Sequence, residues 1–159
     1  MKKRLRNLFR LLRPRQWTKN LAIFATITFT GHLFFLPALI EVIYGFFIFC
    51  AISSAIYVIN DIFDVEKDRL HPFKKNRPLA NGDVSIRTGL VIAVTFTIIS
   101  LIASYLVDPV FFLITLFYLF LQLSYTLYLK HIAVIDILAL AGGYILRVYA
   151  GEVVTGYHI

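Results

Sequence analysis

Long stretches of this sequence contain no charged side chain, and they restrict the chain to folds that a lipid bilayer can hold. Residues 20–40, 42–59, 88–107 and 109–129 contain no Asp, Glu, Lys or Arg. A helix needs about 20 apolar residues to cross roughly 30 Å of hydrocarbon. The whole chain is 59% apolar and 16% charged, against about 45–50% and about 25% in soluble domains. A membrane protein is therefore expected.

We predict an all-α fold, a polytopic transmembrane helix bundle. Strands are not expected, because the alternating ten-residue segments of a membrane β-barrel are missing from the sequence. Residues 1–20 form a basic amphipathic segment that lies on the cytoplasmic membrane surface, and residues 21–159 form the transmembrane domain with a cytoplasmic loop over residues 60–85. Five spans are predicted, over residues 21–39, 42–59, 86–107, 110–129 and 132–150.

Fifteen of the sixteen basic residues lie on one side of these spans, and Arg147 lies within the fifth. Eight precede the first span, six lie between spans two and three, and Lys130 follows span four. By the positive-inside rule the N-terminus and these loops are cytoplasmic, so five spans place the C-terminus outside the cell membrane. The basic N-terminus is interpreted as topogenic charge that also contacts anionic headgroups, and no nucleic-acid partner is predicted.

Acidic residues cluster where the second span ends. On a helix, Asp64 lies about 60° and Asp68 about 20° around the axis from Asp61. The three carboxylates therefore share one face, with Asn60 at its edge. Such carboxylates repel one another unless a cation compensates, and carboxylate and amide oxygens are the ligands of Mg²⁺. We predict a Mg²⁺ site, although a solvated acidic helix end is the simpler alternative.

Cations follow this acidic face directly. Lys74, Lys75 and Arg77 lie in the same loop as Lys67 and Arg69. A metal held by carboxylates beside Arg and Lys is the arrangement that binds a diphosphate and neutralises its charge as it leaves. Each basic residue taken singly is equally well explained as topogenic charge.

The motif Asn60-Asp61-x-x-Asp64-x-x-x-Asp68 resembles the first aspartate-rich motif of the UbiA-type membrane transferase superfamily. Residues 13–20, 68–78, 129–136 and 143–151 further resemble the decaprenyl-phosphate phosphoribosyltransferase branch of that superfamily. The resemblance implies a nine-span fold with two charged motifs around a central cavity. The second motif would come after Ile159, so this chain is expected to supply half an active site.

The resemblance implies transfer of 5-phosphoribose from phosphoribosyl diphosphate to a polyprenyl phosphate, with Mg²⁺ as cofactor. Asp61 and Asp64 are the catalytic candidates, and they bind the metal together with Asn60 and Asp68. The substrate-binding candidates are Lys19, Lys74, Lys75, Arg77, Tyr125, Lys130, Asp136 and Arg147.

Three of these candidates have a second interpretation. Tyr125 is equally typical of a membrane-interface aromatic belt. Asp136 either orients Lys130 or a phosphate ligand, or fixes the end of the fifth span. Arg147 either binds phosphate or reaches the outer interface by snorkelling.

Two other functions remain open at this point. A UbiA-type prenyltransferase that moves a polyprenyl group from its diphosphate to an aromatic acceptor would use the same acidic face. The cations of residues 13–19 and 74–77 favour two phosphorylated substrates instead. A non-enzymatic membrane subunit is the second alternative, but it has no need of the carboxylates. The sequence does not indicate an oligomeric state.

Overall fold

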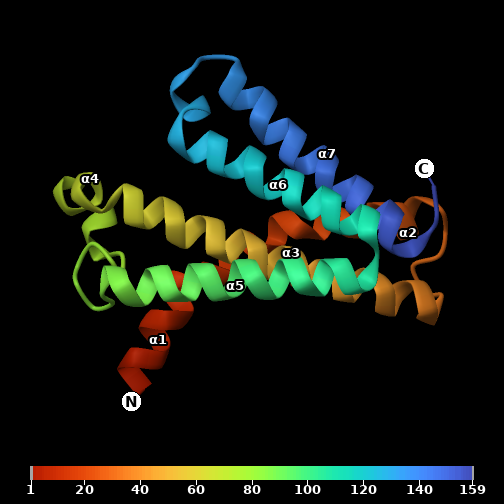
Figure 1. The fold of residues 1–159 in the computed structure, drawn as a ribbon, viewed down its shortest axis with the longest axis horizontal. Coiled ribbons are helices and arrows are strands. Elements are labelled where there is room, and N and C mark those ends of the chain that lie inside the picture. The colour runs from red at the N-terminus through yellow and green to blue at the C-terminus, as the bar shows by residue number, and fades with distance from the viewer. Residues whose placement is uncertain (1, 159) are drawn as a thin grey trace.

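The computed structural model describes residues 2–158, without the side chains of residues 2–4 and 131. The described chain is a bundle of helices joined by short loops (Figure 1). Four helices are long: α3 (Leu36–Phe63), α5 (Ile86–Val107), α6 (Pro109–Leu127) and α7 (Ile135–Thr155). The shorter elements are α1 (Lys2–Leu11), η1 (Pro14–Phe24), α2 (Ala25–Phe29), α4 (Val65–Leu70), η2 (Lys74–Asn76) and η3 (Leu129–His131).

The four long helices are each apolar enough to span a membrane, and within the described residues no other helix is. Helix α5 has the predicted limits, because a cap fixes its start: Ser85 Oγ accepts from Thr88 N at 3.1 Å. Asp108 caps α6 in the same way, accepting from Val110 N at 2.7 Å. The predicted all-helical bundle is confirmed.

The predicted first span over residues 21–39 has the wrong limits. Its first part belongs to the 3-10 helix η1 and to α2, which ends at Phe29, and α3 already begins at Leu36. The η1 segment lies against α7, where a Cβ on Gly151 would be only 2.0 Å from Ile23 O. Thr26 Oγ1 donates to the carbonyl of Val148 at 3.4 Å. Residues 14–29 therefore form a broken helical segment held by tertiary contacts. Five spans are predicted from the sequence, but within the described residues four helices are long and apolar enough to cross a membrane.

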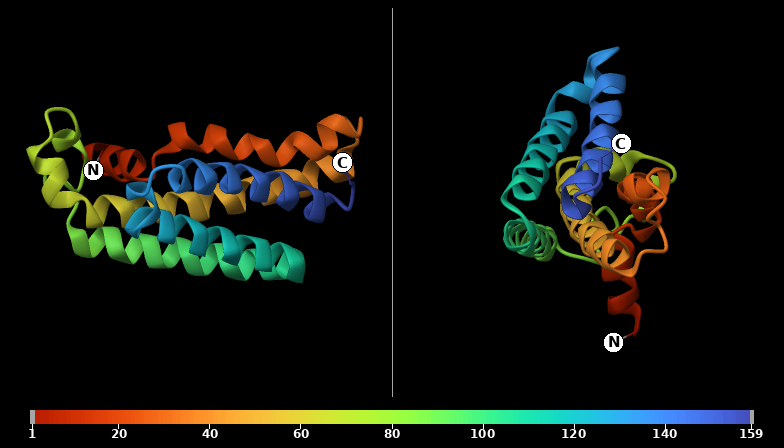
Figure 2. Two further views of the ribbon diagram at one scale, coloured as in Figure 1. Left: turned by 90° about the horizontal axis from the view of Figure 1, so that it is seen from above. Right: turned by 90° about the vertical axis from the view of Figure 1, so that its right-hand side faces the viewer.

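Successive passes run in alternating directions (Figure 2). The α1 helix, the α4–η2 loop and the α6–α7 connection lie at one end of the bundle, while the α5–α6 turn and the C-terminus lie at the other. The larger apolar core includes Ile27, Phe49 and Phe111 from three different elements, all fully buried. A second core around Leu11, Val58 and Leu79 fixes α1 and the loop at the first end. That end carries most of the charged residues.

Candidate functional site

The predicted acidic residues lie where α3 passes into α4. Helix α3 ends at Phe63, and Asp64 joins the two helices with φ −92° and ψ 3°. Helical spacing nevertheless continues, because Asp64 N donates to Asn60 O at 2.9 Å and Asp68 N donates to Asp64 O at 2.8 Å. Asp61 and Asp68 are buried, and Asn60 and Asp64 are half-buried.

Two arginines neutralise Asp61 and Asp68. Arg77 Nη1 lies 3.1 Å from Asp61 Oδ1 and 2.5 Å from Asp68 Oδ2, so one cation bridges two carboxylates. Arg13, from the turn between α1 and η1, also pairs with Asp61. The carboxylate side chains are only 3% and 4% exposed. Asp61 and Asp68 therefore share one small volume, as their spacing predicts.

Lys130 neutralises the third carboxylate. Its Nζ lies 3.2 Å and 3.3 Å from the two oxygens of Asp64, across 66 residues of sequence. This pair brings the α6–α7 connection to the end of α3. Asp136 accepts from the backbone N–H of Ile137 at 2.7 Å in the first turn of α7, and its role in orienting Lys130 or a phosphate ligand stays a prediction.

The donor set suits a hard divalent cation, because carboxylate and amide oxygens are the ligands that such ions prefer. The three carboxylates and the Asn60 amide lie within nine residues of sequence. In the described part of the chain, no three His, Cys, Asp or Glu side chains are grouped closely enough to share a metal ion. Asp61, Asp64 and Asp68 face Arg13, Arg77 and Lys130 instead. We call these six residues the ion-pair cluster. One bridging cation already joins two of its carboxylates.

The other predicted substrate-binding residues lie on three separate elements. Lys74 and Lys75 are exposed on η2, next to Arg77. Tyr125 is half-buried near the end of α6, and Lys19 is half-buried in η1.

Arg147 lies apart from the ion-pair cluster, inside the bundle. It is 4% exposed, and its guanidinium donates to Asn20 Oδ1 at 2.8 Å, to Gly143 O at 2.7 Å and to Tyr118 Oη at 2.6 Å. The interpretation that it snorkels to the outer interface is therefore wrong. A cation at such depth with neutral partners is expensive, and here it ties η1 to α6 and α7.

Arg13 is a site residue that was not among the predicted metal- or substrate-binding candidates. Nothing in its local sequence indicates a partner 48 residues away. The one available signal is the Arg13-Pro14 step, since a proline at the first position of a helix marks a break before it. Arg13 itself has φ 52°, in the left-handed region.

The fold and the site together define a multi-pass membrane protein with a cluster of paired charges at one end of its bundle. The model of the UbiA prenyltransferase family matches residues 20–159, and the chain belongs to that family.

Two relatives, from Mycobacterium tuberculosis and Corynebacterium glutamicum, are named decaprenyl-phosphate phosphoribosyltransferase. The chain is 36% identical to the first over 148 residues, which are 91% of this chain and 49% of the relative. It is 36% identical to the second over 156 residues, which are 96% of this chain and 47% of that relative. The chain thus spans about half the length of these relatives.

A solved structure has the same arrangement of helices. It is a UbiA homolog from Archaeoglobus fulgidus bound to DMAPP and Mg²⁺, 26% identical to this chain. The match has a TM-score of 0.80 and covers 94% of this chain and 55% of the solved one.

Proposed function

We propose that this protein transfers 5-phosphoribose from 5-phosphoribosyl 1-diphosphate to a polyprenyl phosphate, with Mg²⁺, at the cytoplasmic face of the cell membrane. The ion-pair cluster is the observation that carries the proposal. The names of the relatives at 36% identity support the choice of substrates. Because the chain covers about half of those relatives, it would contribute part of the active site.

The charges of the cluster explain why it would take a metal and a diphosphate together. Three carboxylates and three cations balance one another in the absence of ligand. A lone anion would have to displace the carboxylates from their arginines, and a lone metal ion would displace the cations. An ion pair of Mg²⁺ and diphosphate satisfies both sets at once, so each should bind more tightly in the presence of the other.

The residues of the chain have separate roles in this proposal. Asn60, Asp61, Asp64 and Asp68 would hold Mg²⁺, which neutralises charge on the departing diphosphate. Arg77 and Lys130, released from their carboxylates, would bind diphosphate oxygens. An oxygen of the lipid phosphate forms a bond to the anomeric carbon while the bond to diphosphate breaks. The acceptor is already an anion, so no general base is required.

The other predicted substrate-binding residues have less specific roles in this proposal. Lys74 and Lys75 would contact the phosphorylated donor from the loop, and Lys19 and Tyr125 would line its approach from η1 and α6. Asp136, at the start of α7, would orient a phosphate ligand.

A transfer assay tests the function. Membranes that contain the full-length protein are incubated with Mg²⁺, labelled phosphoribosyl diphosphate and a polyprenyl phosphate, and the labelled lipid is extracted. We expect label in the lipid fraction, and none with the Asp61→Asn variant. Label that stays in the aqueous phase under all conditions would refute the proposed reaction.

Transfer of a prenyl group is the second candidate. It is favoured by the structural relative, which was solved with the prenyl diphosphate DMAPP. In the same assay, consumption of a labelled polyprenyl diphosphate with an aromatic acceptor, and none of phosphoribosyl diphosphate, would establish this candidate instead. Inactivity with both donors would refute both candidate reactions.

A further inference from the structure

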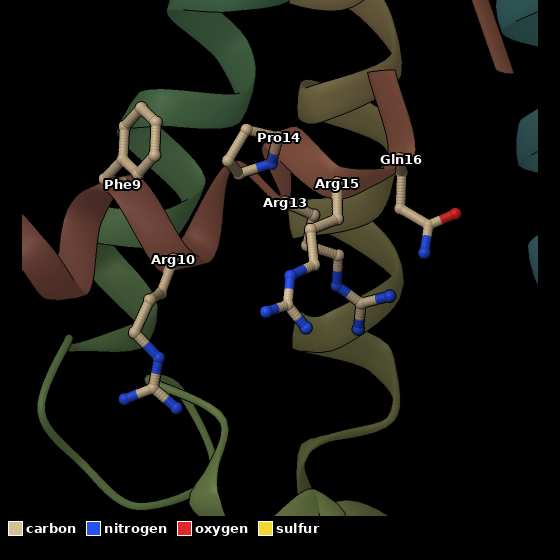
Figure 3. A pocket seen from close by; sticks show the side chains of 6 residues that line it. All are labelled: Phe9, Arg10, Arg13, Pro14, Arg15 and Gln16. Carbon is tan, nitrogen blue, oxygen red and sulfur yellow. The ribbon is translucent and has the colours of Figure 1, made fainter. Parts of the chain in front are cut away.

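A hollow lined by three arginines lies where α1 turns into η1, beside the ion-pair cluster. Its volume is about 580 Å³, and it is lined by Phe9, Arg10, Arg13, Pro14, Arg15 and Gln16. The guanidinium groups of Arg10, Arg13 and Arg15 extend from the ribbon toward one side of the turn (Figure 3). The left-handed backbone of Arg13 creates the turn that brings residues of α1 and η1 together.

A second, smaller hollow of about 250 Å³ adjoins the first. It is lined by Arg10, Phe73, Lys74, Asn76, Arg77 and Pro78. Arg10 belongs to both hollows, and its Nη2 donates to the carbonyl of Asn76 at 3.2 Å, which joins α1 to the loop. The two hollows therefore form one basic surface, which we call the arginine hollow.

Within the described residues, the charge of the arginine hollow is only partly balanced by carboxylates. Arg13 and Arg77 pair with Asp61. Among the residues that the structure describes, Arg10, Arg15 and Lys74 form no ion pair with a carboxylate. Unpaired cations gathered in a concave site raise the local positive potential and attract an anion. This surplus distinguishes the hollow from the neutral ion-pair cluster.

The geometry favours a phosphate monoester over a carboxylate. Planar guanidinium groups bind phosphate oxygens in pairs, and three of them supply more donors than one carboxylate can accept. Arg13 lines the hollow and also pairs with Asp61, so a ligand seated here lies next to the metal-binding candidates. One substrate could then reach both places.

We propose that the arginine hollow binds the dianionic phosphate monoester of a substrate whose reacting end lies at the ion-pair cluster. The identity of that substrate rests on the proposed function, whereas the phosphate-binding property does not. Two sources share this chemistry: the 5-phosphate of phosphoribosyl diphosphate and the terminal phosphate of a polyprenyl phosphate.

Calorimetry with ribose 5-phosphate on the purified full chain tests the hollow alone, because this probe carries no diphosphate. The changes are Arg10→Gln and Arg15→Gln, with Arg87→Gln as the matched control, since Arg87 is exposed in the first turn of α5 and lines neither hollow. Loss of a charge-assisted contact should weaken binding about ten- to a hundredfold, and the control should stay within about twofold. An unchanged thermal transition shows that each variant is folded.

A second experiment, retention on lipid vesicles, distinguishes the lipid phosphate from the 5-phosphate of the soluble donor. Vesicles that contain phosphatidic acid present a lipid phosphate monoester. If Arg10→Gln and Arg15→Gln weaken retention on these vesicles but not ribose 5-phosphate binding, the hollow takes the lipid phosphate. The reverse assigns it to the soluble donor. Equal affinity of wild type and both variants for both probes overturns the proposal, and so does an equal loss with Arg87→Gln.

The experiments distinguish an arginine hollow that does not bind phosphate from a protein that is not the proposed transferase. Asp64→Asn should abolish Mg²⁺-dependent diphosphate binding but leave ribose 5-phosphate binding within about threefold, because the ion-pair partner of Asp64 is Lys130, which lines neither hollow. If wild type does not bind Mg²⁺-diphosphate while Arg15→Gln still weakens ribose 5-phosphate, the transferase proposal falls and the phosphate site stands.

Discussion

Removing Arg77 should destabilise the protein through the two carboxylates that it bridges. In Arg77→Met the apolar stem stays, but Asp68 loses the cation 2.5 Å away and Asp61 keeps only Arg13. Breaking a buried ion pair costs about 3–5 kcal/mol, and we reduce this to about 2–3 kcal/mol because the Arg77 side chain is 26% exposed. At roughly 2–4 °C per kcal/mol, the transition should fall by about 4–12 °C.

The assay is thermal unfolding of the purified protein in detergent, without divalent ions. Arg69→Met is the matched control, because Arg69 pairs at 2.9 Å with Glu66 in the same part of the chain, at side chains 48% and 78% exposed. Surface pairs of this kind contribute less than about 1 kcal/mol. A transition of Arg77→Met within about 1 °C of wild type would refute the energetic role of the bridge.

Addition of Mg²⁺ extends the test from stability to metal binding. Carboxylates released from Arg77 are free to take a metal ion, which stabilises the folded state by about 2.7 kcal/mol at a hundred times its Kd. We expect Mg²⁺ to raise the transition of Arg77→Met more than that of wild type. Equal shifts in both proteins would mean that these carboxylates do not receive the ion.

Three more predictions concern the site, the buried network and the topology. Asp61→Asn should remove nearly all transfer activity while the protein still inserts into membranes, whereas wild-type turnover in excess EDTA would disprove the role of Mg²⁺. Asn20→Ala leaves Nε of the buried Arg147 unpaired, at a cost of about 1.5–3 kcal/mol. The thermal transition should therefore drop by roughly 3–12 °C. An unchanged transition would show that the network does not hold η1. Cysteine labels at Asn81 and Pro37 should react from opposite sides of the membrane, Asn81 from the cytoplasm, and reaction of both from outside would contradict the predicted orientation.

The long helices could be predicted from sequence because their limits are local. Charge-free runs define their interiors, and capping residues such as Ser85 and Asp108 define their starts. The broken first pass could not be predicted in this way. Its shape depends on the contact of Ile23 with Gly151, which lies more than a hundred residues further along the chain.

The site was predictable to a similar extent. Helical spacing alone places Asp61 and Asp68 on one face, and they share Arg77. The pairing of Lys130 with Asp64 depends instead on how α6 and α7 return to the end of α3. Counting residues along a helix gives the depth of Arg147 but not the polar groups that α6 and η1 place opposite it.

Calorimetric binding of the donor tests the central proposal most directly. Phosphoribosyl diphosphate and geranyl diphosphate are titrated into the purified protein with and without Mg²⁺. The extra 5-phosphate provides at least one additional charge-assisted contact, worth about 1.5–3 kcal/mol or roughly ten- to a hundredfold in affinity. We predict that phosphoribosyl diphosphate binds more tightly than geranyl diphosphate by that factor, and only when Mg²⁺ is present. Equal or tighter binding of geranyl diphosphate, or binding of phosphoribosyl diphosphate that is unaffected by removal of Mg²⁺, would contradict it.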